Sequence, residues 1–310
     1  MYTNPYAAFL PNGRRAAAES PAESRTWLWE GHQVHVLQAQ AVAAGVRIIV
    51  VHGAGAHSDA LWPMAAQLVE QGLDVAAIDL PLYGRTRSPH PQRVRYEDWV
   101  RLLRDFVAVH DDGRPIILLG ASIGGLLAYE VAAGSRHVAA VVATCLLDPG
   151  DWRARARMTR FGPIGILAGL LSILSIGPLS TKMIPLRWVA NLARMSRNPE
   201  LSKLCATDPL GGGGVVPVGF LASWIRYRHT PPASTATPVL LVHPEFDSWT
   251  PMRLSSRVLD RIAAPTRTVV LRQCGHFPVE EPGLTDLVDA VIRLSVEVVD
   301  YPDDVFSTRQ

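Results

Sequence analysis

The sequence is poor in cysteine and has no excess of charge of either sign. Its three cysteines, Cys145, Cys205 and Cys274, are odd in number and far apart, which argues against a disulfide framework and against a zinc site. We expect all three to be buried, reduced thiols. The 30 basic residues nearly balance the 28 acidic ones. Because no Lys/Arg block of the type that binds nucleic acid is present, we expect no nucleic-acid partner.

The first residues, MYTNPYAAFLPNGRR, also lack the basic start and the continuous apolar run of a secretory signal peptide. By default we expect a cytoplasmic protein. Residues 1–24 are rich in Ala, Pro, Asn and Ser without periodicity, which predicts an N-terminal arm. The chain has 310 residues, of which 48% are hydrophobic. This is enough for one large α/β domain with an insertion.

Strand and helix patterns alternate along most of the chain. Two alternating runs around Gly31 predict a β-hairpin over 25–40, and unbroken β-branched or apolar runs predict buried parallel strands. The strands are expected at 45–53, 73–80, 115–120, 137–145, 237–247 and 266–271. Helical spacing is found at 61–70, 96–110, 123–133, 253–263 and 284–298. This order predicts βαβ units and a mostly parallel central sheet with helices on both faces.

The alternation stops at Asp148 and resumes after about eighty residues. We therefore expect one α/β core, residues 25–147 and 231–310, interrupted after the sixth strand by a largely helical cap at 148–230. Within it, residues 161–180 carry no charge. That length suits a membrane span, but glycines and prolines interrupt the run and argue against one. We favour two other interpretations: a helical hairpin packed on the core, or a lid whose apolar face lines an acyl pocket or touches lipid. Residues 211–214, four glycines, form a surface loop or a hinge.

A serine stands at a sharp strand-to-helix junction. The stretch GASIG, residues 120–124, fits the pattern G-x-S-x-G, with a predicted strand before it and a predicted helix after it. Small flanking residues are needed there because the turn brings the strand and the helix close together. The helix N-terminus also presents N–H donors beside the hydroxyl. Ser122 is therefore the candidate nucleophile.

A serine nucleophile needs a base, and the base needs an acid to orient it. His276, in QCGHFPVEEP, follows the last predicted strand and is the candidate base. Asp247, in HPEFDSWTP, follows the preceding strand and is the candidate acid. Asp148 is the alternative acid and Glu245 a weaker one. Asp79 also ends a strand, but we expect its carboxylate to hold its own turn.

Acyl transfer also requires donors for the developing oxyanion. The stretch VVHGAGAHSD ends a buried strand in a turn that Gly53 and Gly55 keep free of side chains. The backbone N–H groups of Ala54 and of Ile123, the residue after the nucleophile, are the natural pair.

Five ordered motifs carry a resemblance to a known family: HGAGAHSD, DLPLYGRT, GASIGG, HPEFDSWTP and GHFPVEEP. Over residues 26–298 the chain resembles the α/β-hydrolase superfamily, most closely its monoacylglycerol lipase, lysophospholipase and esterase branch. The resemblance implies an α/β-hydrolase fold and a cap over the site. It also implies a nucleophile, an acid, a base and two oxyanion donors at Ser122, Asp247, His276, Ala54 and Ile123. One departure is Ala121, where many relatives have His.

The resulting hypothesis is a serine hydrolase that cleaves a carboxylic ester of a small hydrophobic substrate and uses no metal or cofactor. The same three residues also suit C–C, thioester or amide hydrolysis, or acyl transfer to an alcohol. A catalytically silent fold that binds a hydrophobic molecule is the alternative from another class. The sequence predicts neither the physiological substrate nor the oligomeric state.

Overall fold

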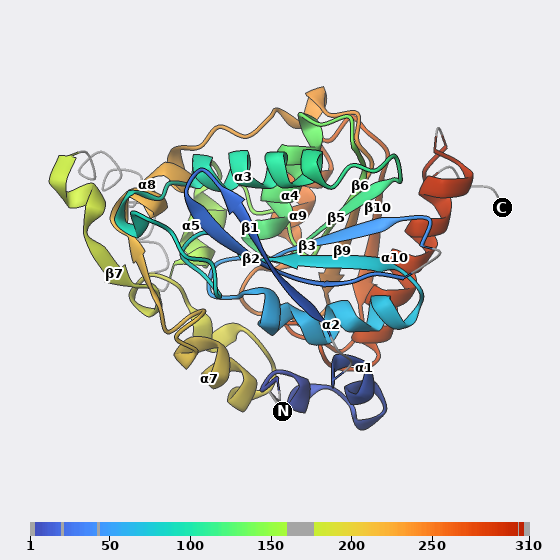
Figure 1. Cartoon of the computed structure of the whole chain (residues 1–310), viewed down its shortest axis with the longest axis horizontal. Helices are drawn as coiled ribbons and strands as arrows, with labels where there is room; N and C mark the ends of the chain where they lie inside the picture. The colour runs from blue at the N-terminus through green and yellow to red at the C-terminus, as the bar shows by residue number, and fades with distance from the viewer. Residues whose placement is uncertain (1–3, 20–21, 42–43, 160–176, 303, 307–310) are drawn as a thin grey trace.

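The computed structural model describes residues 4–19, 22–41, 44–159, 177–302 and 304–306 (Figure 1). Within these ranges eight strands form one sheet in the order β1-β2-β4-β3-β5-β6-β9-β10. Its strands are β1 (Glu23–Trp29), β2 (His32–Ala39), β3 (Arg47–Val51), β4 (Asp74–Ile78), β5 (Ile116–Gly120), β6 (Val138–Ala143), β9 (Val239–Pro244) and β10 (Thr266–Leu271). The pairs β1–β2 and β2–β4 are antiparallel and the others are parallel.

Helices cover both faces of this sheet. α2 and α10 lie on one face, and α3, α4 and α9 lie on the other (Figure 1). Their bounds are α2 (Ser58–Glu70), α3 (Tyr96–Val109), α4 (Ile123–Ala133), α9 (Met252–Leu259) and α10 (Gly283–Asp300). Every residue of β3, β4 and β5 is buried, as expected for unbroken apolar runs covered on two sides. The predicted mostly parallel α/β sheet is thus confirmed, with element ends that differ by a few residues.

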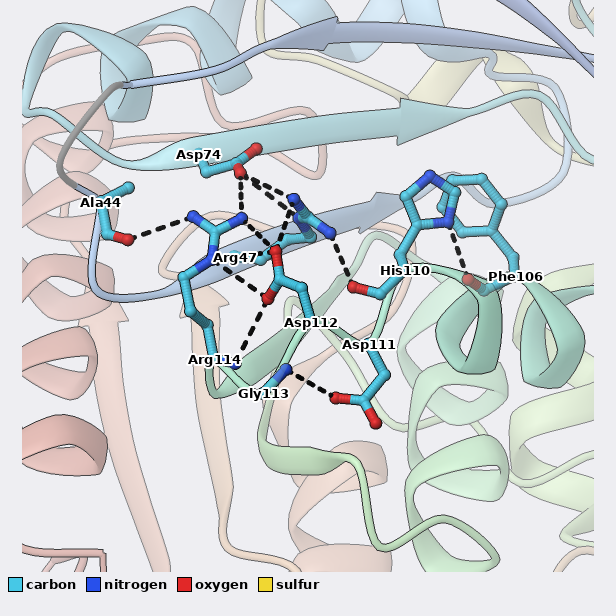
Figure 2. Close-up of polar contacts among 9 residues, drawn as sticks. All are labelled: Ala44, Arg47, Asp74, Phe106, His110, Asp111, Asp112, Gly113 and Arg114. Atoms are coloured by element: carbon cyan, nitrogen blue, oxygen red, sulfur yellow. Dashed lines mark hydrogen bonds and ion pairs between the residues drawn. The ribbon is translucent and has the colours of Figure 1, made fainter.

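An ion-pair network holds the amino edge of the sheet, where β3 and β4 begin. Asp74 accepts hydrogen bonds from Arg47 at 3.0 Å and from Arg114 at 2.8 Å, and Asp112 pairs with both arginines. Figure 2 shows the two guanidinium groups on either side of these carboxylates. Arg47 also donates to the carbonyl oxygen of His110. Because the candidate nucleophile and the candidate acid follow the opposite ends of their strands, this network lies away from the candidate site.

The insertion, residues 148–230, connects β6 to β9. Its described part contains the helices α5 (Trp152–Met158), α7 (Pro199–Thr207) and α8 (Val218–Arg226). It also contains a two-stranded antiparallel sheet, β7 (Met183–Pro185) with β8 (Val215–Pro217), which the pattern did not predict. Most of the uncharged run 161–180 lies outside the described residues. No helix in the described ranges has both the length and the apolarity of a membrane span.

The segment predicted as an arm lies against the core. Residues 4–19 form two 3₁₀ turns and the short helix α1 (Arg15–Glu19). The side chains of Tyr6 and Leu10 are each 1% exposed, and Asn4 donates a hydrogen bond to the carbonyl oxygen of Asp59 in α2. Apolar burial and polar contacts therefore hold this segment on the body of the protein.

Candidate active site

Ser122 sits in a strained turn between β5 and α4. Its φ is 56° and its ψ is −127°, a backbone conformation that residues other than glycine rarely adopt. The flanking glycines permit the turn: a Cβ at Gly124 would lie 2.5 Å from the carbonyl oxygen of Val51, and one at Gly120 would overlap the backbone of Gly124. The tight packing of β5, α4 and β3 thus requires glycine on both sides of the serine.

His276 and Asp247 form a buried hydrogen-bonded pair. Asp247 follows β9 and His276 follows β10, and His276 Nδ1 lies 2.7 Å from Asp247 Oδ2. The other carboxylate oxygen of Asp247 accepts hydrogen bonds from the backbone N–H groups of Trp249, at 2.9 Å, and Thr250, at 2.7 Å. The indole ring of Trp249 packs 4.9 Å from the imidazole ring. These contacts hold both side chains in one orientation.

The charge state of Asp247 follows from these contacts. Burial by itself raises the pKa of the carboxyl, but the electrostatic interaction with His276 and the hydrogen bonds from His276 and Thr250 outweigh burial and lower the pKa to about 2. Asp247 is therefore ionised at neutral pH. An ionised carboxylate only accepts hydrogen bonds, so His276 Nδ1 carries the proton and Nε2 has its lone pair free.

The base and the nucleophile share one small pocket. Ser122, His276 and Ala54 all line it. Nε2 of His276 is buried and has no hydrogen-bond partner among the described residues. The Ser122 side chain interacts with the thiol of Cys145, whose pKa is raised by burial. The structure thus places an unused basic nitrogen and a strained serine along the same cavity, without a hydrogen bond between them.

The loop that carries the predicted oxyanion donor Ala54 lies beside the serine and the second predicted donor, Ile123. A Cβ added to Gly53 would lie 2.8 Å from Ser122 Cβ and 3.3 Å from the amide nitrogen of Ile123, so the loop after β3 runs directly along the start of α4. His52 holds this loop: its Nδ1 lies 2.8 Å from the Gly53 carbonyl oxygen, and its Nε2 accepts a hydrogen bond from Leu80 N–H. Burial lowers the pKa of His52 to about 4, which keeps the ring neutral and able to accept that bond.

The other carboxylates considered from the sequence do not contact His276. Asp148 lies 3.6 Å from Arg261 and accepts a hydrogen bond from Gly150 N–H. Glu245 accepts one from Gln273 N–H. Asp79 accepts hydrogen bonds from the backbone of Ser58 and Arg85, as expected for a residue that holds its own turn. Among these candidates the geometry favours Asp247 as the acid.

Two threonines that the sequence reasoning missed support the site. Thr250 Oγ1 donates to Asp247 Oδ2 at 2.6 Å and lies 3.2 Å from His276 Nδ1. Thr144 Oγ1 accepts a hydrogen bond from Ser122 N–H at 2.9 Å. A signal for Thr250 existed, because a hydroxyl three residues after an Asp in a turn favours a local hydrogen bond. No such signal existed for Thr144, because its hydrogen bond joins residues that follow two different strands, β5 and β6.

Comparisons with known proteins agree with this architecture. A monoacylglycerol lipase from Mycolicibacterium smegmatis is 27% identical to this chain over 230 residues, which is 70% of this chain and 75% of the relative. A soluble variant of monoglyceride lipase from Saccharomyces cerevisiae has a similar structure, with a TM-score of 0.72 at 13% identity, over 94% of this chain and 98% of the other. The structure of a monoacylglycerol lipase from Paleococcus ferrophilus is also similar, with a TM-score of 0.66 at 18% identity. The match covers 86% of this chain and 98% of the other.

A family model supports the assignment most directly. Residues 48–289 match the model described as the alpha/beta hydrolase family, and this range contains all five candidate site residues, Ser122, Asp247, His276, Ala54 and Ile123. The match covers well over half of the chain, and the sheet order and the strand–turn–helix junction at the serine agree with it. The chain therefore belongs to the α/β hydrolase family.

Proposed function

We propose that this protein is a serine hydrolase that cleaves a carboxylic ester of a hydrophobic substrate through an acyl-enzyme on Ser122. The observation that carries the proposal is the buried Asp247–His276 pair, whose free Nε2 lines the same pocket as the strained serine. The similarity to monoacylglycerol lipases supports ester hydrolysis as the reaction.

In the proposed mechanism His276 Nε2 takes the hydroxyl proton of Ser122 as the oxygen attacks the ester carbonyl. The ionised Asp247 stabilises the imidazolium that forms. The backbone N–H groups of Ala54 and Ile123 bind the oxyanion, and such donors contribute about 3–4 kcal/mol each in other acyl-transfer enzymes. His276 then protonates the leaving alcohol, and water repeats the sequence on the acyl-enzyme.

The pocket suits an apolar acyl group. Apart from the candidate catalytic residues its lining is mostly apolar, contributed by Ala56, Leu61, Met64, Met195, Phe277 and Pro278. Met195 belongs to the insertion and the other five belong to the core. We therefore propose that residues 148–230 act as a cap that completes the acyl pocket, and that the core comprises 25–147 and 231–310.

Hydrolysis of p-nitrophenyl esters of increasing chain length tests this proposal, together with labelling by a fluorophosphonate probe. We expect turnover and covalent labelling of the wild-type protein, and loss of both in Ser122→Ala with unchanged circular dichroism. Undiminished turnover in Ser122→Ala would refute the acyl-enzyme. An unlabelled, inactive wild-type protein would favour the silent binding protein. Labelling without ester turnover would point to one of the other reactions that the same residues suit.

A further inference from the structure

The near-neutral net charge of the chain conceals a strongly basic stretch. Residues 152–199 contain eight basic side chains and no Asp or Glu. The rest of the chain is left with 22 basic and 28 acidic residues. This stretch makes up much of the insertion, whose helices α5, α7 and α8 lie in the left half of the view in Figure 1. The insertion therefore carries positive charge on a body of opposite sign.

Three exposed arginines of this stretch meet around the loop that holds the candidate acid. The carbonyl oxygen of Arg157 accepts a hydrogen bond from the indole N–H of Trp249 at 3.0 Å. Arg194 donates to the carbonyl oxygen of Ser248 at 3.2 Å. The guanidinium of Arg197 lies 4.8 Å from the ring centre of Phe246. We call Arg157, Arg194 and Arg197 the arginine rim.

The charge of the arginine rim is not neutralised locally. Among the described residues none of its three members forms an ion pair with a carboxylate, whereas Arg114 pairs with two. Glu200, three residues after Arg197, is exposed at the start of α7. Five other acidic groups of the surrounding segments are engaged elsewhere. Their partners are Arg257 for Asp151, Arg261 for Asp148, Gln273 N–H for Glu245, Ser196 for Glu280 and His276 for Asp247. Positive charge is thus presented to solvent at this place.

Exposed aromatic side chains accompany these arginines. Phe246, under the guanidinium of Arg197, is 48% exposed and Trp188 is 55% exposed. Trp188 lies two residues before Ala190, which forms a β-bridge with Thr159 at the end of α5. Aromatic rings beside exposed cations are typical of surfaces that bind at the headgroup level of a membrane.

The arginine rim borders the pocket of the proposed active site. Met195, directly after Arg194, lines that pocket with Ser122, and the backbone N–H of Phe277 donates to the Met195 carbonyl oxygen at 2.7 Å. A surface bound at the rim would therefore lie next to the cavity.

We propose that the arginine rim, with Trp188 and Phe246, docks on an anionic phospholipid bilayer and brings the pocket to the lipid surface. Arginine guanidinium groups pair well with phosphate oxygens, and anionic headgroups attract clustered basic residues. This inference goes beyond the proposed reaction and does not depend on it, because the nucleophile plays no part in docking.

Co-sedimentation with vesicles tests the docking. We expect the wild-type protein to bind vesicles of phosphatidylcholine with 30% phosphatidylglycerol and to bind pure phosphatidylcholine at least about tenfold more weakly. Raising the NaCl concentration should release it. The combined variant R157E/R194E/R197E should bind anionic vesicles about tenfold or more weakly than the wild type. The variant R157Q/R194Q/R197Q should bind with intermediate strength, and it replaces the first variant if that one fails to fold.

A matched control separates local from overall charge. The variant R87E/R136E/R293E makes the same change of net charge at exposed positions of the core and should bind anionic vesicles as the wild type does. Ser122→Ala should also bind normally, so failure of the proposed reaction leaves this test intact. Equal binding to neutral and anionic vesicles, equal loss in the control variant, or no vesicle binding would overturn the proposal. So would binding to a DNA duplex as tight as to anionic vesicles.

Discussion

The hydroxyl of Tyr6 donates a 2.6 Å hydrogen bond to Oδ2 of Asp208, 202 positions further along the chain. The same carboxylate oxygen lies 2.7 Å from Nε2 of His57, at the start of α2. The Tyr6 ring stacks on Phe277, the neighbour of His276, with ring centres 6.1 Å apart. One residue of the N-terminal segment thereby joins the insertion, the core and the loop of the candidate base.

This relationship predicts different effects for two substitutions of Tyr6. Tyr6→Phe keeps the ring on Phe277 but removes the bond to Asp208, so we expect a loss of about 1.5–3 kcal/mol in stability and nearly normal kcat. Tyr6→Ala removes the ring as well, and we expect about 3–5 kcal/mol in stability and a clear fall in kcat as the His276 loop loses support. Urea unfolding and ester kinetics measure both. A normal kcat in Tyr6→Ala would contradict the link to His276.

The choice of acid can be tested by a matched pair of substitutions. Asp247→Asn removes the charge that holds His276 Nδ1–H and stabilises the imidazolium, so we expect kcat to fall by roughly a thousandfold or more. Asp148→Asn changes a half-buried carboxylate that contacts Arg261, and we expect nearly wild-type turnover. The p-nitrophenyl ester assay compares the two. A larger loss in Asp148→Asn would reverse the assignment.

Acid stability should depend on the hydroxyl of Thr250. Because the pKa of Asp247 is lowered to about 2 in the folded protein, the carboxylate contributes stability fully above about pH 4. That contribution, about 2 kcal/mol, is lost as the pH falls towards 2. Thr250→Val removes the donor to Oδ2 and should raise the pKa of Asp247, so acid unfolding should begin at a higher pH.

Thr250→Ser retains the hydroxyl and is the control for this effect. Tryptophan fluorescence followed from pH 6 to pH 2 at a fixed urea concentration gives the midpoint of acid unfolding. We expect the serine variant to unfold near the wild-type midpoint. Coinciding midpoints for the valine variant and the wild type would show that the two backbone N–H groups alone hold Asp247.

The network at the amino edge of the sheet should govern stability without affecting catalysis. Asp74, 3% exposed, accepts bonds from two arginines (Figure 2). Among the described residues, Asp74→Asn leaves Asp112 as the one carboxylate paired with both guanidinium groups and should destabilise the fold by about 3–5 kcal/mol. Asp112→Asn, at a more exposed position, should change stability by about 1 kcal/mol or less. Urea unfolding measures both, and kcat of the folded fraction should stay unchanged. A similar cost for the two variants would contradict the importance of burial.

The sequence by itself predicted the strands and helices of the core and pointed to Ser122 as the candidate nucleophile. The predicted parallel strands and the five core helices follow from apolar runs and helical spacing, which are local properties of neighbouring residues. The serine was identified because its required glycines are also its sequence neighbours. Asp247 and His276 follow the last two predicted strands. Because the carboxyl ends of parallel strands meet at one edge of a sheet, the two side chains were expected to lie close together.

Only the tertiary structure decided which distant groups touch. Asp148 and Asp247 both follow strands, so the sequence favoured Asp247 but left Asp148 as an alternative. Of the two, only Asp247 lies within hydrogen-bond distance of His276. Tyr6 belongs to a segment without periodicity, yet it is buried because Asp208 and Phe277 offer a hydrogen bond and a ring. The arginine rim likewise brings Arg157, Arg194 and Arg197 to one loop, Arg157 through its backbone carbonyl oxygen and the other two through their guanidinium groups. Such contacts join residues that are far apart in the sequence, so they depend on the tertiary fold and cannot be predicted from the spacing of neighbouring residues.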